Sequence, residues 1–485
     1  MAAPAERAWP GGLPVSGRDM AVRREAGLVA KADARRNASA SHAARTQGGG
    51  LNATLVLIGI GIVVPNLLAV AALACDIGLP PRPMPILGYC LIAGLARWRS
   101  PRFMACLYFM VLAYDLMSTI SGMFGLSAVE IEDSLRFASD LRLLSSPLYL
   151  GMAGSAAAMM ALMPWLFRRS HATLRRARIG PAMILVMGLV LADTFVAITP
   201  NYALGSILSQ GTRVVSAVEV SGFGATVLRA GNGRDVLLVL VEALGRFVDP
   251  AHQRLLEMPF QAASLRKHYQ VTTGTVPYFG ATTAGEMREL CHSREPYTAH
   301  IGAASQDCLP AVLAAAGYRT TAVHAYSENF FDRQEWYPNI GFERMLFGEQ
   351  MLEELHDTCG GVFRGLCDDN VGETVLPRLM AQDKQKQFVY WLTLNTHVPV
   401  RPGEGTPRLG CADAATDPFG HGDVCAMTEL WLDVFDRVVA LALADPKRPM
   451  DILLMGDHAP PLWSRKGRAL FRPGEVTWIR LAPRG

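Results

Sequence analysis

The uneven distribution of apolar residues is the strongest constraint on how this chain can fold. Half of the 485 residues are hydrophobic, and nearly all of the long charge-poor runs lie before about residue 200. A helix needs about 20 such residues to cross the hydrocarbon core of a bilayer. The sequence therefore predicts an N-terminal α-helical transmembrane domain with five spans. These spans are expected at 51–77, 84–98, 103–126, 146–167 and 179–199.

The second expected span is the weakest of the five. It has only about 15 apolar residues, which is short for a membrane crossing. Four spans are therefore the alternative. The number decides where the second half of the chain lies, because an odd number of crossings places it on the opposite side of the membrane from the N-terminus.

Basic residues at the span ends indicate the orientation. They are concentrated before the first span, between the second and third, and between the fourth and fifth, and cytoplasmic connections carry such an excess. The chain from about residue 200 onward is therefore expected outside the cytoplasm. The basic residues are Arg23, Arg24, Lys31, Arg35, Arg36, Arg97, Arg99, Arg102, Arg168, Arg169, Arg175, Arg176 and Arg178.

The remaining segments complete the expected organisation. Residues 1–50 are rich in Ala, Arg and Gly without apolar periodicity, which predicts a disordered cytoplasmic tail. Apolar residues within 129–144 recur at helical spacing, which predicts a helix on the outer face of the membrane or a packed loop helix. Residues 51–200 would form the transmembrane domain, 201–234 a juxtamembrane connector and 235–485 an extracytoplasmic catalytic domain.

Apolar strand candidates alternate with helical stretches in the second half of the chain. This alternation predicts an α/β/α domain with a mainly parallel sheet covered by helices on both faces. Such sheets bind their ligands outside the carboxyl ends of the strands. Strands are expected at 236–241, 320–323, 388–394, 452–455 and 478–481, and the clearest helices at 309–316 and 426–444.

Six cysteines lie in this second half. An even set in one globular domain indicates three disulfides and an oxidising compartment. Six free thiols or a metal site in a cytosolic domain is the alternative, although no two of the six form a Cys-x-x-Cys pair. Nearest-neighbour pairing, one of about 15 possible connectivities, would join Cys291 to Cys308, Cys359 to Cys367 and Cys411 to Cys425.

Acidic residues and a histidine follow two of the expected strands. Glu242 ends six consecutive apolar residues, and Asp457 and His458 follow the strand at 452–455 after a glycine. A buried carboxylate is costly unless it is paired, and carboxylate oxygens with one imidazole suit Zn²⁺ or Mn²⁺ better than Ca²⁺. Each motif alone is more often an ordinary turn or cap. Their joint occurrence predicts a metal site.

Two threonines at a loop-to-helix junction are candidate nucleophiles. Thr282 and Thr283 precede Glu286 in an arrangement that resembles a capping box. A helix N-terminus offers backbone N–H groups to a phosphate, and a hydroxyl that touches a metal ionises more easily. A simple N-cap is the alternative interpretation of the same residues.

The order of these segments resembles the alkaline phosphatase and sulfatase superfamily, in particular its membrane-anchored branch. That branch comprises lipoteichoic acid synthases, phosphoglycerol transferases and phosphoethanolamine transferases. The resemblance implies a sulfatase-like catalytic domain, and it covers roughly residues 235–462. It is carried by the strand ending in Glu242, Thr282-Thr-Ala-Gly-Glu286, Leu309-Pro310, Gly317-Tyr318, His324-Ala-Tyr326, Phe330-Phe-Asp-Arg333, Tyr337-Pro338, Leu394-Asn-Thr-His397 and Gly456-Asp-His458.

The resemblance also implies roles for individual residues. Glu242, Thr282, Asp457 and His458 would hold the metal, and Thr282 would become the phospho-threonine. His397 would bind the phosphate or serve the leaving and entering hydroxyls. The expected substrate-binding residues are Arg333, with Phe331 packed beside it, His324 and Thr283.

The function implied is a metal-dependent transferase in a bacterial cytoplasmic (inner) membrane, with its catalytic domain in the periplasm. It would move phosphoglycerol or phosphoethanolamine from a phospholipid to an envelope glycan or lipid, without a nucleic-acid partner. Ala243 and Ala459 depart from the pattern of many relatives. An inactive membrane-tethered scaffold and a sulfatase or phosphodiester hydrolase are the alternatives. A transporter is disfavoured, because Asp115 and Asp193 have no evident basic partner.

Overall fold

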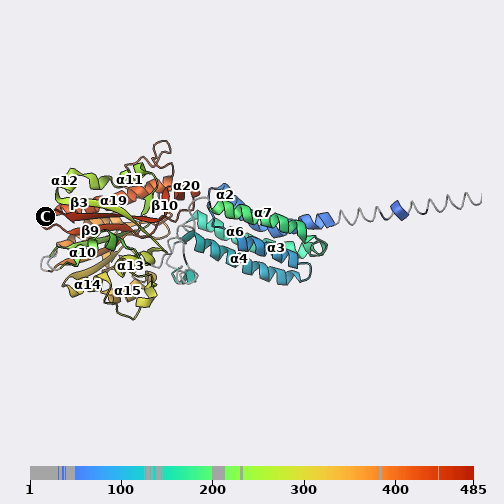
Figure 1. Ribbon diagram of the computed structural model, residues 1–485, viewed down its shortest axis with the longest axis horizontal. Coiled ribbons are helices and arrows are strands. Elements are labelled where there is room, and N and C mark those ends of the chain that lie inside the picture. Colours follow the sequence, from blue (N-terminus) through green and yellow to red (C-terminus); the bar gives the residue numbers. More distant parts are fainter. Residues whose placement is uncertain are drawn as a thin grey trace, which may run out of the picture.

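The computed structural model describes two parts of the chain, a helical bundle and an α/β domain, which lie side by side (Figure 1). It describes residues 50–124, 146–198, 213–229, 233–381, 385–445 and 447–484, with short stretches within 31–39 and 126–144. Most of the expected disordered tail, much of the 129–144 segment, and residues 201–212 and 230–232 of the connector lie outside the described residues.

Apolar helices make up the first part. Among the described residues, three helices are long and apolar enough to cross a bilayer, and two further apolar helices are shorter. The structure therefore supports three to five crossings, and the expected total of five is not established. The long helices are Gly50–Ala74, which contains the π-helical turn η1 (Gly59–Val63) and α2 (Val64–Ala74), then α4 (Pro101–Phe124) and α6 (Pro147–Leu174). The shorter ones are α3 (Pro83–Leu95) and the part Ile179–Phe195 of α7 (Ile179–Ile198), whose last three side chains lie outside the described residues.

A buried polar cluster joins four of these helices. Arg82, which precedes α3, forms an ion pair with Asp115 of α4, and the Tyr89 hydroxyl donates to the same carboxylate over 2.9 Å. Arg82 also donates to Asn66 of α2 (3.4 Å) and, through its backbone N–H, to Asp193 of α7 (2.6 Å). The expectation that the two acids have no basic partner was wrong, because the arginine comes from the α2–α3 connection and not from another span.

Replacing Arg82 with methionine should destabilise this bundle. The change leaves the Asp115 carboxylate buried without a counter-charge, and breaking a buried ion pair in this way costs about 3–5 kcal/mol. We expect a lower thermal unfolding midpoint for the full-length protein in detergent. Adding Asp115→Leu to the same chain should recover part of the loss, because the unpaired charge is then removed. An unchanged midpoint in the single variant would contradict the structural role.

The second part is built on one mixed sheet with the strand order β2-β10-β9-β1-β8-β4-β5, and β3 pairs with β10. Neighbouring strands along β9-β1-β8-β4-β5 are parallel to one another. β10 runs antiparallel to β9, β2 and β3. The expected mainly parallel sheet is therefore confirmed, with an antiparallel margin. The strands are β1 (Val236–Val241), β2 (Gly245–Phe247), β3 (Tyr269–Pro277), β4 (Arg319–His324), β5 (Arg344–Leu346), β8 (Gln387–Leu392), β9 (Asp451–Gly456) and β10 (Phe471–Pro483), and a separate hairpin pairs β6 (Thr358–Cys359) with β7 (Gly365–Leu366).

The five strands expected from the sequence coincide with β1, β4, β8, β9 and β10. β3 was missed, although its residues Val271, Thr272, Thr273, Thr275 and Val276 form the β-branched run that favours a strand. Most of β3 is at least partly exposed, so it lacks the apolar run that marks the central strands.

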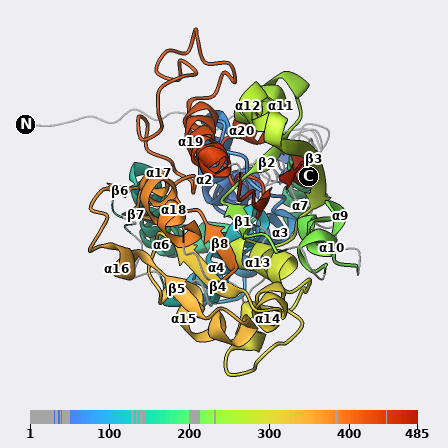
Figure 2. The ribbon, with the colours of Figure 1, turned by 90° about the vertical axis from the view of Figure 1, so that its left-hand side faces the viewer.

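Helices cover both faces of the sheet and enclose two cores (Figure 2). The side chains of β1 alternate between these cores, as the two-residue period of a strand requires, with Leu237 and Val239 on one face and Val236 and Leu238 on the other. On the first face lie α11 (Pro250–Leu256), α12 (Ala263–His268), α18 (Leu376–Met380) and α19 (Gly422–Ala444), and on the second α10 (Phe223–Val227), α13 (Thr282–Leu290) and α14 (Leu309–Ala315). Shorter helices are α9 (Ala217–Val220), η3 (Met258–Gln261), η4 (Tyr297–His300), η5 (Phe330–Asp332), α15 (Arg333–Trp336), η6 (Pro338–Ile340), α16 (Gly348–Met351), α17 (Asp368–Asn370), η7 (Val371–Val375) and α20 (Arg465–Ala469).

The segment that follows β9 contacts the helical bundle directly. The Gly78 N–H donates to the Trp463 carbonyl (2.9 Å), and the Ser464 hydroxyl donates to Asp76 (2.6 Å). The Tyr149 ring at the start of α6 lies 6.2 Å from the Trp463 ring, measured between centroids. The carboxyl end of β9 therefore leads, within a few residues, to the end of the bundle.

The connection between α4 and α6 makes a second contact with the α/β domain. Phe137 is 7% exposed, and its ring lies 5.6 Å from that of Phe330 and 5.3 Å from that of Phe331, measured between centroids. Beside it, Arg136 forms an ion pair with Asp332 (3.3 Å). An aromatic side chain from the N-terminal half thus completes a hydrophobic core of the C-terminal half.

Three disulfides are present in the α/β domain. They join Cys291 to Cys308, Cys359 to Cys367 and Cys411 to Cys425, which is the nearest-neighbour pairing. Disulfides of this kind persist in oxidising compartments.

Candidate active site

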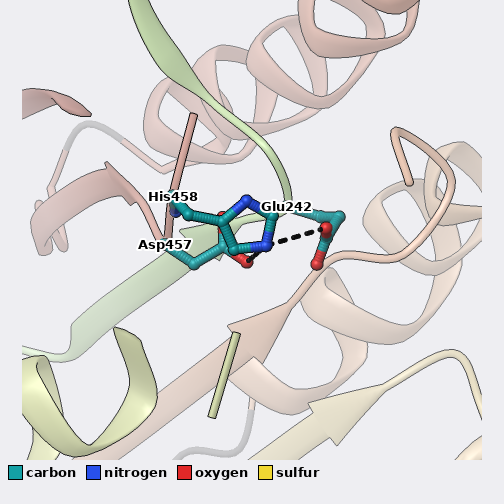
Figure 3. A group of neighbouring side chains, drawn as sticks. All are labelled: Glu242, Asp457 and His458. Atoms are coloured by element: carbon teal, nitrogen blue, oxygen red, sulfur yellow. Dashed lines mark hydrogen bonds and ion pairs between the residues drawn. The ribbon is translucent and has the colours of Figure 1, made fainter. Parts of the chain in front are cut away.

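Four residues from three separate segments meet at the carboxyl edge of the sheet. Glu242 directly follows β1, and Asp457 and His458 directly follow β9 (Figure 3). The parallel register of these two strands pairs Val241 with Gly456, so the next residues along each strand are neighbours. Thr282, the first residue of α13, completes the group, because its hydroxyl oxygen lies 3.1 Å from Glu242 Oε2 and 3.4 Å from His458 Nε2.

The three ligand atoms offered by Glu242, Asp457 and His458 lie within 4.8 Å of one another. Among the described residues, two buried carboxylate oxygens, Glu242 Oε1 and Asp457 Oδ2, have no hydrogen-bond partner. Both face His458 Nε2, at 3.5 and 3.3 Å respectively. Unpaired buried carboxylate oxygens around one imidazole nitrogen are the donor set expected for a divalent cation, so these residues fit a metal.

The electrostatics of the cluster also favour a divalent cation at this position. Burial, and then the neighbouring Asp457 carboxylate, raise the pKa of Glu242 well above its ordinary value. Two adjacent buried carboxylates disfavour each other's ionised form, and a divalent cation between them would reverse that effect. Zn²⁺ and Mn²⁺ both accept carboxylate and imidazole donors.

Backbone groups hold the two carboxylates in place. Asp457 Oδ1 accepts hydrogen bonds from the N–H groups of Ala243 (2.8 Å) and His458 (2.7 Å), which leaves Oδ2 for the cluster. Ala243 adopts a positive φ of 57°, a conformation that costs a non-glycine residue about 1 kcal/mol. This backbone conformation directs the Ala243 N–H toward Asp457.

Glu242 is held from two sides. Its N–H donates to the Thr393 hydroxyl (2.9 Å), and its carbonyl accepts from the hydroxyl of Thr396 (2.6 Å) and from Trp431 Nε1 (3.2 Å). Thr393 and Thr396 follow β8, so the loop after the adjacent strand fixes the backbone from which the Glu242 side chain projects.

The ring orientation of His458 suits a ligand. Its Nδ1 lies 3.0 Å from the Ala459 carbonyl, and only a protonated nitrogen can donate to a carbonyl. The neutral ring therefore carries its lone pair on Nε2, which faces the two carboxylates.

The expected capping box at the start of α13 was wrong. The N-cap residue is Ala281, and it makes no side-chain cap hydrogen bond. Glu286 is fully buried and accepts hydrogen bonds from Arg333 (2.8 Å), Tyr390 (3.2 Å) and the Tyr337 hydroxyl. A buried charged side chain needs a partner of opposite charge, and the partner of Glu286 is Arg333 of α15. Its carboxylate is therefore not available to cap the start of α13.

Arg333 and Phe331 lie together, as expected. The guanidinium carbon of Arg333 is 5.6 Å from the centroid of the Phe331 ring. The guanidinium is 2% exposed and is engaged by Glu286 and by the Phe330 carbonyl, so its expected contact with a substrate headgroup stays a prediction. Phe331 has a positive φ of 56°, and Asp332 one of 51°, so this turn is strained.

Of the two expected histidines, His324 is the last residue of β4, and His397 lies in the loop that follows β8. Burial lowers the pKa of His397 to about 4, and the charge of nearby His458 contributes to this shift. Burial and the charge of Arg333 lower the pKa of His324 to about 3. Both rings are therefore neutral near pH 7, and His397 is covered by the Phe363 ring, whose centroid is 3.7 Å away. Thr283 is half-buried beside Thr282.

Asp368 supports the loop that carries His397. Its Oδ2 accepts from the N–H groups of Leu394 (2.8 Å) and Asn395 (2.7 Å), while Oδ1 is buried without a partner. Burial raises the pKa of Asp368 from 3.8 to about 7. The folded protein therefore binds a proton at this site that the unfolded chain releases near pH 4.

Replacing Asp368 with asparagine should remove this pH dependence. Between about pH 4 and 7 the folded wild type binds the extra proton, so raising the pH lowers its free energy of unfolding by up to about 1.4 kcal/mol per pH unit. The asparagine oxygen can still accept both N–H groups. We expect the difference in thermal midpoint, variant minus wild type, to rise from pH 4.5 to pH 7 and then to level off. A difference that is the same at every pH would contradict the raised pKa.

Two functional features were not expected from the sequence. Arg288, on the inner side of α13, and Asp368 both hold the backbone beside candidate site residues. The Asp368-Asp369 pair directly after Cys367 was a possible signal in the sequence. Adjacent acids are usually exposed, however, and so the pair does not by itself predict the buried supporting role of Asp368. Arg288 lies in a short polar helix and offers no such signal.

Comparison with known proteins assigns the C-terminal domain. Residues 234–462 match the family model described as Sulfatase. The resemblance to the alkaline phosphatase and sulfatase superfamily is thereby confirmed, and residues 234–462 form a sulfatase-family domain. A search of curated protein sequences finds no match to this chain.

Several solved structures are similar to this chain at low identity. The lipoteichoic acid synthase LtaP from Listeria monocytogenes is 15% identical with a TM-score of 0.40, and the match covers 57% of this chain and 70% of that one. The Streptococcus pyogenes phosphoglycerol transferase GacH is 17% identical with a TM-score of 0.36, covering 52% and 68%. The C-terminal periplasmic domain of Escherichia coli EcEptC, solved with Zn, is 13% identical with a TM-score of 0.33, covering 51% and 73%. The family assignment of residues 234–462 rests on the match to the family model and not on these structures.

Proposed function

We propose that this protein is a membrane-anchored transferase that moves a phosphorylated headgroup, phosphoglycerol or phosphoethanolamine, from a phospholipid to a hydroxyl of an envelope glycan or lipid. One observation carries the proposal. The Thr282 hydroxyl lies within 3.4 Å of both Glu242 and His458, in a cluster with two unpaired carboxylate oxygens.

Glu242, Thr282, Asp457 and His458 would hold a Zn²⁺ or Mn²⁺ ion. When bound, this cation would supply positive charge that favours the ionised threonine hydroxyl and offsets the charge of phosphate oxygens. The N-terminal N–H groups of α13, on which Thr282 lies, would add donors for the same oxygens.

The chemistry would proceed in two displacements. Thr282 Oγ1 attacks the phosphorus of the phospholipid, the Oγ1–P bond forms, and the bond from phosphorus to the diacylglycerol oxygen breaks. The proton lost from the threonine ends on diacylglycerol. An acceptor hydroxyl then attacks the phospho-threonine, the Oγ1–P bond breaks, and the acceptor's proton returns to Thr282.

His397 is the candidate for carrying these protons. Its Nδ1 lies 2.9 Å from the Val398 carbonyl, so the neutral ring presents its lone pair on Nε2. Its lowered pKa keeps the ring unprotonated near pH 7, so Nε2 would be available to accept a proton from an incoming hydroxyl and to pass it on. His324, Thr283, Phe331 and Arg333 would line the headgroup side of the site.

The position of the site supports a lipid substrate. The loop that begins with Asp457 and His458 reaches the helical bundle at Trp463 and Ser464. A tethered site beside the membrane meets a membrane-embedded donor at high effective concentration. We propose that this domain faces the periplasm across a bacterial inner membrane, where its three disulfides would be maintained.

Labelled donors in proteoliposomes test the proposal. The full-length protein is loaded with Mn²⁺ or Zn²⁺ and given phosphatidylglycerol or phosphatidylethanolamine labelled in the headgroup, with an envelope glycan as acceptor. Transfer of label to the acceptor, with release of diacylglycerol, supports the proposal. Release of the label as a free water-soluble phosphate indicates a hydrolase. Metal-loaded protein that turns over neither lipid would indicate the scaffold alternative.

A further inference from the structure

We infer that Arg288 is a positioning residue that fixes Asp457, and that α13 thereby carries both the nucleophile and the clamp on a metal ligand. This inference rests on the proposed function. Arg288 lies on the same helix as Thr282 and is fully buried. It makes no contact with the reacting atoms, so its influence acts through Asp457.

The guanidinium of Arg288 bridges two consecutive backbone carbonyls. Its Nη1 donates to the Asp457 carbonyl (3.0 Å), and its Nη2 donates to the Gly456 carbonyl (2.7 Å). Gly456 ends β9, and Asp457 is the first residue after it. The two bonds fix both peptide planes from which the Asp457 side chain projects.

Glu289 fixes the arginine in turn. Its carboxylate accepts from Arg288 Nε (2.7 Å), and it also accepts from the N–H groups of Ala217 and Val218, both at 3.1 Å. The buried charge is therefore paired, and the planar guanidinium has one orientation. Lysine cannot reproduce this arrangement, because it presents a single ammonium in place of a planar fork.

Close packing transmits this constraint to Asp457. A Cβ atom built on Gly285 of α13 would lie 2.8 Å from the Asp457 Cβ, so the helix backbone rests directly against the ligand residue. Rotation of the Asp457 peptide would move Oδ2 away from Glu242 and His458. Loss of a supporting partner behind a metal ligand typically weakens metal binding by about 10–100-fold.

Zinc affinity of the full-length protein in detergent tests this inference. Arg288→Met and Arg288→Lys are compared with wild type by competition against a chromophoric chelator, and folding is checked by the thermal midpoint. Arg480→Met is the matched control, because this arginine also donates to a backbone carbonyl, that of Ser221, but lies on β10 opposite Leu453 and away from the cluster. We expect zinc binding about 10–100-fold weaker in Arg288→Met, an intermediate loss in Arg288→Lys, and wild-type affinity in the control.

The possible outcomes separate this inference from the proposed function. Wild-type protein that binds neither zinc nor, in a parallel titration, manganese would remove the proposed function itself. Wild-type protein that binds zinc, together with a folded Arg288→Met variant of equal affinity, would overturn only the role of Arg288. If Arg288→Met does not fold, the zinc affinity of Arg288→Lys tests the inference instead, because lysine keeps the positive charge beside Glu289. Wild-type zinc affinity in Arg288→Lys would overturn the inference. Saturating zinc should restore kcat in the lysine variant, whereas a purely structural defect would persist.

Discussion

Replacing Thr282 with alanine should lower the proposed headgroup transfer by on the order of 10³-fold or more, because the change removes the oxygen that would form the proposed covalent intermediate. In the described part of the chain the side chain makes two hydrogen bonds, both within the cluster, so the fold should be retained. Initial rates with headgroup-labelled phosphatidylglycerol measure the loss. Intact mass spectrometry after acid quenching should show a phosphorylated headgroup on the wild type and none on the variant.

The adjacent threonine provides the matched control. Thr283→Ala removes a hydroxyl from the same helix turn but leaves Thr282 in contact with Glu242. Peptide mapping of this variant should still place the adduct on residue 282. Full turnover by Thr282→Ala, or an adduct on Thr283 in the wild type, would rule out the proposed nucleophile.

Replacing Asp457 with asparagine should weaken metal binding by more than about 100-fold, since it removes a proposed charged ligand itself and not only its support. The asparagine oxygen can still accept from the N–H groups of Ala243 and His458, which places the amide nitrogen where Asp457 Oδ2 now faces His458. A neutral donor group at that position cannot coordinate a cation. Metal content after dialysis and zinc titration of the refilled protein measure the effect.

Asp368→Asn is the control for this second prediction. Asp368 is also a buried carboxylate with one unpaired oxygen, but it does not belong to the cluster. It should bind zinc as the wild type does. Asp457→Asn protein that retains stoichiometric zinc at wild-type affinity would show that the cluster is not the metal site.

The sequence predicted the part of the site that depends on strand ends. Six apolar residues before Glu242 and a short apolar strand before Asp457 are local patterns, and parallel strands bring their carboxyl ends to one edge. The structure places Glu242, Thr282, Asp457 and His458 together as that reasoning required. Their roles as ligands and nucleophile stay predictions.

The supporting contacts could not be predicted in the same way. Glu286 pairs with Arg333 of another helix, and Arg82 pairs with Asp115 of another apolar segment. Such partners are far apart in the chain and become neighbours only through packing, so no local spacing reveals them. Glu286 also shows how a residue pattern can mislead, because its position after Thr282 fits a capping box while burial sends its carboxylate to Arg333.

The burial of Phe137 among Phe330 and Phe331 has a consequence for soluble fragments of this protein. A secreted fragment that begins after the last apolar helix would keep the cluster but leave those two rings uncovered, next to the strained turn before Arg333. Exposed aromatic surface of this kind promotes self-association. Rates of the proposed transfer measured on such a fragment would therefore describe a domain that lacks part of its hydrophobic core.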